Sequence, residues 1–392
     1  MSAPLDRLVA EADAALADVD AVLASDEDRR AAASARGPEP VHVCYVPADR
    51  VSATTAQAWG TAALEALDTW SGLVGDVGED LPAVLPRVRR VLGSCPVADL
   101  RADLEDGYGH RGDDVEDADA AHAGAAVAAV LAGERAPWRA GPRVKSMEAA
   151  TRRRGLRSWA LFLDAFLDAG GDPGRLRVTL PKVSAPEQVA AFVAACASLE
   201  TSRGLDPIPV EIQVETPRAV LTGVTSLIDA AGGRCAGLHY GTYDYSAALG
   251  IAPDQQRADH PAAEHAKAVL QVAGAALGVP VCDGSSALLP VGSASDVLEA
   301  WRAQARIVRR ALELGIGQGW DMHPGNVPIR LAVVHAVHRA GAPRAVERLR
   351  AYREGAASGV LDEPATERAL VAFLRRGLAC GALDADEVAG LA

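Results

Sequence analysis

The amino-acid sequence predicts an α/β fold, namely a TIM-type (β/α)8 barrel of eight parallel strands with helical extensions at its N- and C-terminal ends. Short apolar runs typical of buried strands alternate with helix-length amphipathic segments along most of the chain. Acidic or basic residues lie at or after nearly every apolar run, and barrel enzymes place their chemistry at the C-terminal ends of the strands. An open, doubly wound sheet is the rival fold for the same alternation.

The expected elements follow one another in a regular order. The predicted strands are Val41–Val46, Val97–Leu104, a short strand opening at Pro142–Val144, Leu176–Leu180, Val210–Val214, Ala236–Tyr240, Val279–Cys282 and Gln318–Met322. The clearest helices between them are Ala53–Leu73, Asp117–Ala132, and three that place Leu156 and Trp159, Val189 and Phe192, or Leu298 and Trp301 on one apolar face. This order predicts three regions: a helical arm at 1–40 with a Gly37-Pro38 stop signal, a catalytic barrel at 41–330, and a helical extension at 331–392.

Composition limits the possible functions. The formal charge of −13 over 392 residues argues against general affinity for nucleic acid or for an anionic membrane surface. No apolar run approaches the roughly 18 residues of a membrane span, and the N-terminus lacks the pattern of a signal peptide, which favours a cytoplasmic protein. The six cysteines form no CxxC pair, so we expect small buried side chains rather than a zinc site or disulfides.

Two acids mark the middle of the chain. Glu215 directly follows the run Val210–Val214, and Asp244 comes shortly after the run Ala236–Tyr240. They are separated by about the length of one βαβ unit of ~30 residues, so consecutive parallel strands would present both carboxylates at one edge of the sheet. Two hard oxygen ligands at a shared edge suit Mg²⁺ or Mn²⁺. The alternative is structural, with Glu215 near a helix N-cap and Asp244 in a turn.

Seven segments carry a resemblance to a known family. They are DLEDGYG at 103–109, RVKSM at 143–147, LPKVSAPEQV at 180–189, IQVETPRAV at 212–220, GTYDYSAALG at 241–250, VCDGSS at 281–286 and WDMHP at 320–324. Their order and spacing resemble the HpcH/HpaI aldolase and citrate lyase β-subunit family, which is related to malate synthase. The resemblance covers about Val41 to Arg330 and implies a TIM barrel, a divalent metal, a homo-oligomer, and carbon–carbon bond cleavage or formation through an enolate.

The resemblance also implies roles for individual residues. Glu215 and Asp244 look like the metal ligands, and Arg143 looks like the arginine that holds a substrate carboxylate or acyl oxygen. Glu105 and Asp106 look like the acidic corner after the second strand, where the acid in DLED is similar to the citrate lyase branch rather than to the aldolase branch, which has a histidine there. Gly107, Tyr108 and Gly109, and Tyr243 and Tyr245 around Asp244, depart from both branches.

Enolate chemistry explains these residue types. A cation fixed beforehand stabilises the enolate oxygen, and a planar guanidinium can grip a carboxylate with two hydrogen bonds. We expect Asp106 or a metal-bound water to be the general base. Glu105 has either a direct role or the task of orienting Arg143 or a metal-bound water, and Arg143 has a structural ion pair as its alternative. Lys182 and Asp283 are expected to bind substrate. Asp283 would either hydrogen-bond to the substrate directly or support a residue that contacts it.

The sequence therefore favours a divalent-metal-dependent carbon–carbon lyase that acts on a small oxo- or hydroxy-acid or its coenzyme A thioester. Thioester hydrolysis and a condensation like that of malate synthase are alternatives that the same residues could serve. A non-catalytic barrel that binds an acyl-CoA or carboxylate is a further alternative of a different class. His323 is expected to pack at a strand end, and the acidic run Gly112–Asp119 to form a solvated loop.

Overall fold

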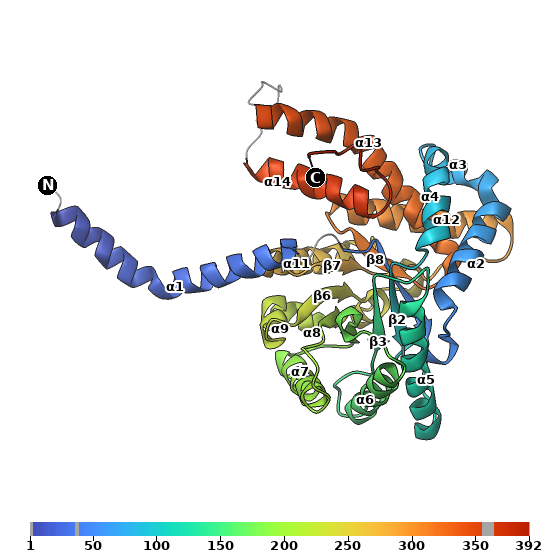
Figure 1. Cartoon of the computed structure of the whole chain (residues 1–392), viewed down its shortest axis with the longest axis horizontal. Helices are drawn as coiled ribbons and strands as arrows, with labels where there is room; N and C mark the ends of the chain where they lie inside the picture. The colour runs from blue at the N-terminus through green and yellow to red at the C-terminus, as the bar shows by residue number, and fades with distance from the viewer. Residues whose placement is uncertain (1–2, 36–38, 355–363, 392) are drawn as a thin grey trace.

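A computed structural model describes residues 3–35, 39–354 and 364–391. Its eight parallel strands pair in chain order and close into a barrel, which confirms the predicted fold class (Figure 1). Closure depends on the pairing of the first strand with the last, in which Val43 lies beside Trp320, and this pairing excludes an open sheet. The strands are β1 (His42–Pro47), β2 (Asp99–Asp103), β3 (Arg139–Arg143), β4 (Val178–Leu180), β5 (Val210–Val214), β6 (Cys235–Tyr240), β7 (Val281–Asp283) and β8 (Gln318–Asp321).

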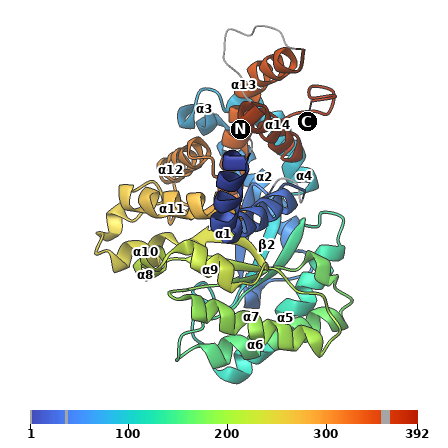
Figure 2. The same ribbon diagram turned by 90° about the vertical axis from the view of Figure 1, so that its left-hand side faces the viewer.

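Helices surround the barrel (Figure 2). They are α2 (Thr55–Trp70), α3 (Val74–Val77), α4 (Leu85–Ser94), α5 (Asp113–Ala132), α6 (Arg152–Asp168), α7 (Pro186–Thr201), α8 (Pro217–Thr222), α9 (Val224–Ala230), α10 (Thr242–Ala248), α11 (Pro261–Leu277) and α12 (Ala294–Glu313). Apolar side chains of these helices pack on the outer face of the strands, and Trp159, Phe162 and Phe166 of α6 are fully buried there. Five of the six cysteines are buried and none forms a disulfide, as predicted.

Two local predictions were wrong. The third strand begins at Arg139 rather than at Pro142, so Arg143 is its last residue and not its start. The strand passes through Gly141, where a glycine is needed because any side chain would collide with the Arg177 carbonyl of the neighbouring chain segment. The acidic run 112–119 is not a loop, since α5 begins at Asp113 and its buried Glu116 pairs with Lys145 at 3.0 Å. Acids in a first helical turn are favoured by the helix dipole.

The predicted helical extensions are present at both ends. α1 (Ala3–Ala35) precedes the barrel, and α13 (Val327–Glu354) and α14 (Pro364–Ala379) follow it. The expected stop at Gly37-Pro38 lies outside the described residues. α13 starts before the predicted boundary at 330/331, and its Arg330 donates to Asp321 of β8 at 2.8 Å, which ties this helix to the barrel. No helix among the described residues is long and apolar enough to cross a membrane.

Candidate active site

Polar side chains fill much of the barrel interior because they occupy alternate strand positions. Asp99, Arg101 and Asp103 alternate along β2, and Glu211 and Gln213 alternate along β5. Alternate residues of a strand share one face, so each set forms a column inside the barrel. Low in the barrel, the fully buried Arg101 guanidinium pairs with both Asp99 and Glu211. This inner layer is a closed ion-pair network and leaves the C-terminal end of the strands as the accessible part of the site.

Arg143 stands at the end of β3 and is held in a fixed orientation. Its Nε and Nη2 each donate to one oxygen of Asp103 at 2.7 Å, and the guanidinium lies 4.9 Å from the ring centre of Tyr45. Nη1 is left to face Gln213 Oε1 at 3.4 Å and Glu105 Oε2 at 3.6 Å. The structural ion pair that was the alternative for Arg143 thus exists with Asp103. This pair orients Nη1 of Arg143 toward Glu105 at the end of the barrel strands.

Lys182, directly after β4, is the centre of the cluster. Its ammonium lies 2.7 Å from Asp244 Oδ2, 2.9 Å from Asp106 Oδ2 and 3.1 Å from Glu105 Oε1. Its backbone N–H donates to Glu215 Oε1 at 2.6 Å. Lys182 is the one non-glycine residue with a positive φ, 52°, in the described ranges. Such strain costs about 1–3 kcal/mol and persists where the surroundings fix the conformation.

The four acids around Lys182 differ in exposure. Glu215 and Glu105 are buried, whereas the side chains of Asp106 and Asp244 are 57% and 46% exposed. Burial raises the pKa of Glu215 to about 8, although Lys182 and Arg143 oppose the change. Burial likewise raises the pKa of Glu105 to about 7, against the opposing charge of Arg143. The pKa of Asp106 is lowered, because hydrogen bonds with Glu105 and Lys182 outweigh its partial burial.

The donor chemistry of this cluster fits a hard divalent cation. The oxygens of Glu105, Asp106 and Asp244 converge on the single ammonium of Lys182, and Glu215 accepts from the backbone N–H of the same residue. Within the described chain, no group of three or more His, Cys, Asp or Glu side chains is arranged to hold a metal ion. A site of one or two carboxylates completed by water or substrate, as Mg²⁺ uses, needs no such group. Glu215 and Asp244 fit that smaller set once the Lys182 side chain turns away.

The structure brings six of the seven predicted site residues together and places the seventh elsewhere. Glu105, Asp106, Arg143, Lys182, Glu215 and Asp244 form the cluster described above. Asp283 is buried, with one oxygen 2.9 Å and the other 3.0 Å from the ammonium of Lys267, and it also accepts from the Gly284 N–H at 2.7 Å. Its contacts are with its own strand end and α11, so the predicted contact with substrate has no support from these bonds.

Sequence reasoning missed two residues that position the site. Asp103 holds Arg143, and Gln213 donates to Glu215 while its oxygen faces Arg143. Their signal was present as polar residues at every second position of otherwise apolar strands. His323 accepts a hydrogen bond from the Gly325 N–H at 3.1 Å and caps the turn before α13, in agreement with the structural role expected for it.

Comparisons with known proteins agree with this architecture. The model of one domain family, described as "Domain of unknown function (DUF6986)", matches residues 24–392. No curated protein matches the sequence. A citrate lyase from Burkholderia xenovorans LB400 has a similar structure, with a TM-score of 0.60 and 23% identity over 91% of this chain and 97% of that one.

Two further solved structures share the fold. The protein CitE from Mycobacterium tuberculosis, in complex with magnesium, acetoacetate and coenzyme A, has a TM-score of 0.52 and 20% identity over 86% of this chain and 97% of that one. A magnesium and glyoxylate complex of Haloferax volcanii malate synthase has a TM-score of 0.51 and 14% identity over 87% and 96% of the respective chains. The resemblance expected from the seven segments is therefore confirmed at the level of the fold.

Proposed function

The chain belongs to the DUF6986 family, and we propose that it is a divalent-metal-dependent carbon–carbon lyase that works through an enolate. The observation that carries the proposal is the convergence of Glu105, Asp106 and Asp244 on the Lys182 ammonium, with Glu215 bound to the backbone N–H of Lys182 and Nη1 of Arg143 close to Glu105. Breaking a bond next to a carbonyl leaves an enolate, whose oxygen needs positive charge fixed in advance. A cluster of acids around a replaceable cation, next to a preoriented guanidinium, supplies such a place.

Each residue of the cluster has a task in this proposal. Glu215 and Asp244 would hold Mg²⁺ or Mn²⁺, and the bound metal would supply a Lewis acid for the carbonyl oxygen of the substrate. Arg143 binds a carboxylate or acyl oxygen through Nη1, because Asp103 occupies its Nε and Nη2. Lys182 binds the second negative group of the substrate when its ammonium leaves the acids. Asp103 and the ring of Tyr45 keep Arg143 in place.

The structure favours Glu105 over Asp106 as the group that moves a proton. Asp106 is more than half exposed and its pKa is lowered, so it is a weak base at neutral pH. Glu105 is buried beside Arg143, and its pKa of about 7 suits both accepting and donating a proton. In the cleavage direction Glu105 accepts the proton of the substrate hydroxyl, the new carbonyl forms, and the electrons of the broken carbon–carbon bond pass to the enolate. The condensation runs the same steps in reverse.

The substrate class follows from the charges and from the ligands of proteins with this fold. Two cationic side chains, Arg143 and Lys182, at one end of the barrel suit a small oxo- or hydroxy-acid. Acetoacetate, glyoxylate and coenzyme A occupy the solved structures named above, which supports an oxo-acid or its coenzyme A thioester as the substrate here. The same two proteins bind magnesium, which supports Mg²⁺ as the metal. A homo-oligomer, which the sequence resemblance implies, belongs to the same proposal.

Isothermal titration of metal-stripped protein with Mg²⁺ tests this function. We expect Mg²⁺ to bind, and to bind more tightly when pyruvate, oxaloacetate or acetyl-CoA is present. Asp244→Asn should abolish binding, whereas Asp254→Asn, an exposed acid outside the cluster, should bind as the wild type does. Equal Mg²⁺ binding in both variants would exclude this site. Absence of any Mg²⁺ binding by the wild type would exclude the lyase and leave a barrel whose acids serve its own architecture.

A further inference from the structure

α1 carries an apolar surface that no described part of its own chain covers. Every described side chain from Asp6 to Ser25 is exposed, and the helix reaches the body only through its last turns. There Arg29 pairs with Asp229 at 2.8 Å, and Arg30 donates to the Ala276 carbonyl at 2.8 Å. The rest of this helix leads away from the barrel (Figures 1 and 2). At 1.5 Å per residue the whole helix is about 50 Å long, far longer than its contacts require.

The exposed part of α1 has an ordered pattern. Its large apolar side chains are Leu8, Val9, Leu16, Val19, Val22 and Leu23, which are between 49% and 63% exposed. At 3.6 residues per turn they fall on one stripe about 140° wide. Glu11 and Asp18 follow one edge of this stripe, and Asp13 and Asp20 follow the other, each pair seven residues apart. An isolated helix with such a face is unstable in water and gains its stability from packing.

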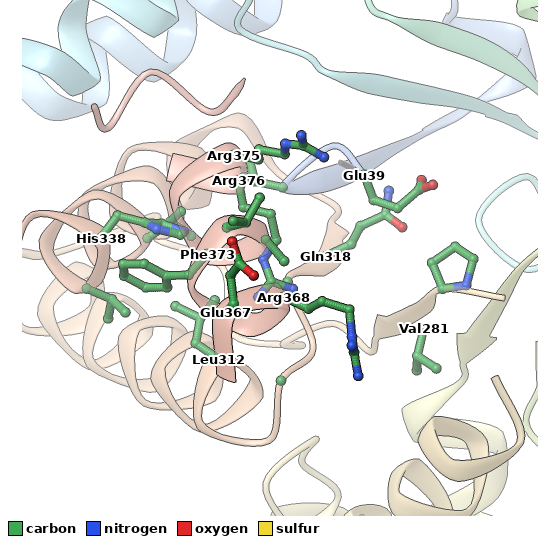
Figure 3. A pocket seen from close by; sticks show the side chains of 18 residues that line it. Glu39, Val281, Leu312, Gln318, His338, Glu367, Arg368, Phe373, Arg375 and Arg376 are labelled. Carbon is green, nitrogen blue, oxygen red and sulfur yellow. The ribbon is translucent and has the colours of Figure 1, made fainter. Parts of the chain in front are cut away.

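A groove of about 670 Å³ lies between α14 and the β7–β8 side of the barrel (Figure 3). Its walls are largely apolar and include Val371 and Phe373 of α14, Val281 of β7 and Leu312 of α12. Arg368, Arg375 and Arg376 of α14 also line it. Across the described part of the chain no carboxylate pairs with these three arginines, because Glu367 pairs with Arg353 and Glu39 pairs with Arg139. The groove is therefore apolar with unpaired positive charge on one wall.

The helix and the groove are complementary. Arg368 and Arg375 are seven residues apart on α14, the same spacing as Glu11 and Asp18 on α1. Two helical turns separate the two charges on each helix, so the acids of α1 can face the arginines of α14. The apolar stripe of α1, which lies beside these acids, can then fill the groove. Glu11 also pairs with Arg7 of the same helix at 2.9 Å, and both of these side chains are largely exposed. The apolar stripe of α1 is exposed in the described chain. We propose that the exposed part of α1 docks in the α14 groove of a second copy of this chain.

A second copy fits better than the other occupants. The chain's own α1 is held on α9 by Arg29 and on α11 by Arg30 and points away, so it does not reach its own groove (Figure 1). Pairing of two α1 helices through their stripes would bring the acid rows of both together, which like charges oppose. Glu39 and Val41 line the groove close to where the arm meets the barrel. A reciprocal exchange of arms between two copies therefore brings each arm near the other copy's groove.

Sedimentation equilibrium of the full-length chain over a concentration series tests the exchange. The stripe variant Leu16→Asp/Leu23→Asp should weaken association at least tenfold. Its matched control is Ala14→Asp/Ala21→Asp, which places the same residues on the opposite, alanine face of α1 and should associate as the wild type does. The groove variant Arg368→Glu/Arg375→Glu should weaken association similarly, while Arg344→Glu, an exposed arginine outside the groove, should not.

Charge exchange distinguishes this docking from other contacts. Combining Arg368→Glu/Arg375→Glu with Glu11→Arg/Asp18→Arg should restore association that each pair alone weakens. Loss of association in the stripe variant with no effect of the groove variant would place α1 on another surface and overturn the proposal. Equal masses for the wild type and all variants would overturn it as well. If the groove variant instead loses only binding of octanoate in calorimetry, the groove holds a small organic anion and not the helix.

Discussion

The ammonium of Lys182 lies 2.7 Å from Asp244 Oδ2, at the place where a bound cation would meet the same oxygen. Burial alone would lower the pKa of Lys182, but the surrounding carboxylates, Glu215 first among them, raise it, so the side chain remains charged at neutral pH. In the proposed function the Lys182 ammonium therefore neutralises the acids in the metal-free protein, and a bound metal would displace that ammonium from the carboxylate oxygens. Two cations cannot occupy one set of oxygens, which makes the relationship testable.

Lys182→Met should make the stability of the protein depend on Mg²⁺. Without metal, four acids lose their shared counter-charge, and we expect a loss of about 2 kcal/mol in the free energy of unfolding. At one fixed Mg²⁺ concentration the variant, which has no ammonium for the metal to displace, should bind Mg²⁺ more tightly and therefore gain more stability than the wild type. Thermal unfolding with and without Mg²⁺ measures both effects. A Tm that responds to Mg²⁺ no more in the variant than in the wild type would show that Lys182 and the metal do not share a position.

The raised pKa values of Glu215 and Glu105 predict a pH dependence. Both carboxyls hold their protons more tightly in the folded state, at pKa values of about 8 and 7 against an ordinary 4.5. Their contribution to stability is therefore complete below about pH 4.5 and is lost as the pH rises through 7 and 8. Metal-free protein should therefore lose about 1.4 kcal/mol of stability per pH unit for each of the two carboxyls, up to about pH 7 for Glu105 and about pH 8 for Glu215.

Urea unfolding at several pH values measures this loss, and Glu215→Gln should remove most of it. Mg²⁺ should oppose it, because the metal binds the deprotonated carboxylate, and binding at pH 7 should release protons. Proton release appears as a dependence of the calorimetric enthalpy on the ionisation enthalpy of the buffer. A flat stability profile in the metal-free wild type would contradict the shifts at these two residues.

Asp103→Asn should damage the site without touching any group proposed to contact the substrate. The change removes the charge that balances the buried Arg143 and one of the two hydrogen bonds that orient it. Leaving a buried charge without its partner costs about 3–5 kcal/mol. Arg143→Lys keeps the charge but loses the fork, so it should retain more stability than Asp103→Asn while binding oxaloacetate at least tenfold more weakly. Chemical denaturation and calorimetry separate the two effects, and equal stability of Asp103→Asn and the wild type would contradict the pairing.

The fold and most of the cluster could be predicted from the sequence because parallel strands end at one edge. Glu105, Asp106, Lys182, Glu215 and Asp244 were all found from their positions after strands. The placement of the Lys182 ammonium among the acids could not be predicted, because it depends on a left-handed backbone at a residue where lysine is not expected. Asp283 also follows a strand, but its carboxylate meets Lys267 of α11, and strand position alone does not show which partner a side chain will take.

Gly241→Ala should disturb the metal site by shape alone. A Cβ at this position would collide with the Glu215 side chain, including its Oε2, so the carboxylate must move although no charge changes. Overpacking at such a site costs about 1–3 kcal/mol, and a displaced ligand should weaken Mg²⁺ binding at least tenfold. Gly93→Ala is the matched control, because nothing surrounds that position in α4 and alanine is the better helix former. Calorimetric titration of both variants with Mg²⁺ decides the matter: if Gly241→Ala binds as tightly as Gly93→Ala, Glu215 is not a metal ligand, and its burial serves only to anchor the Lys182 backbone.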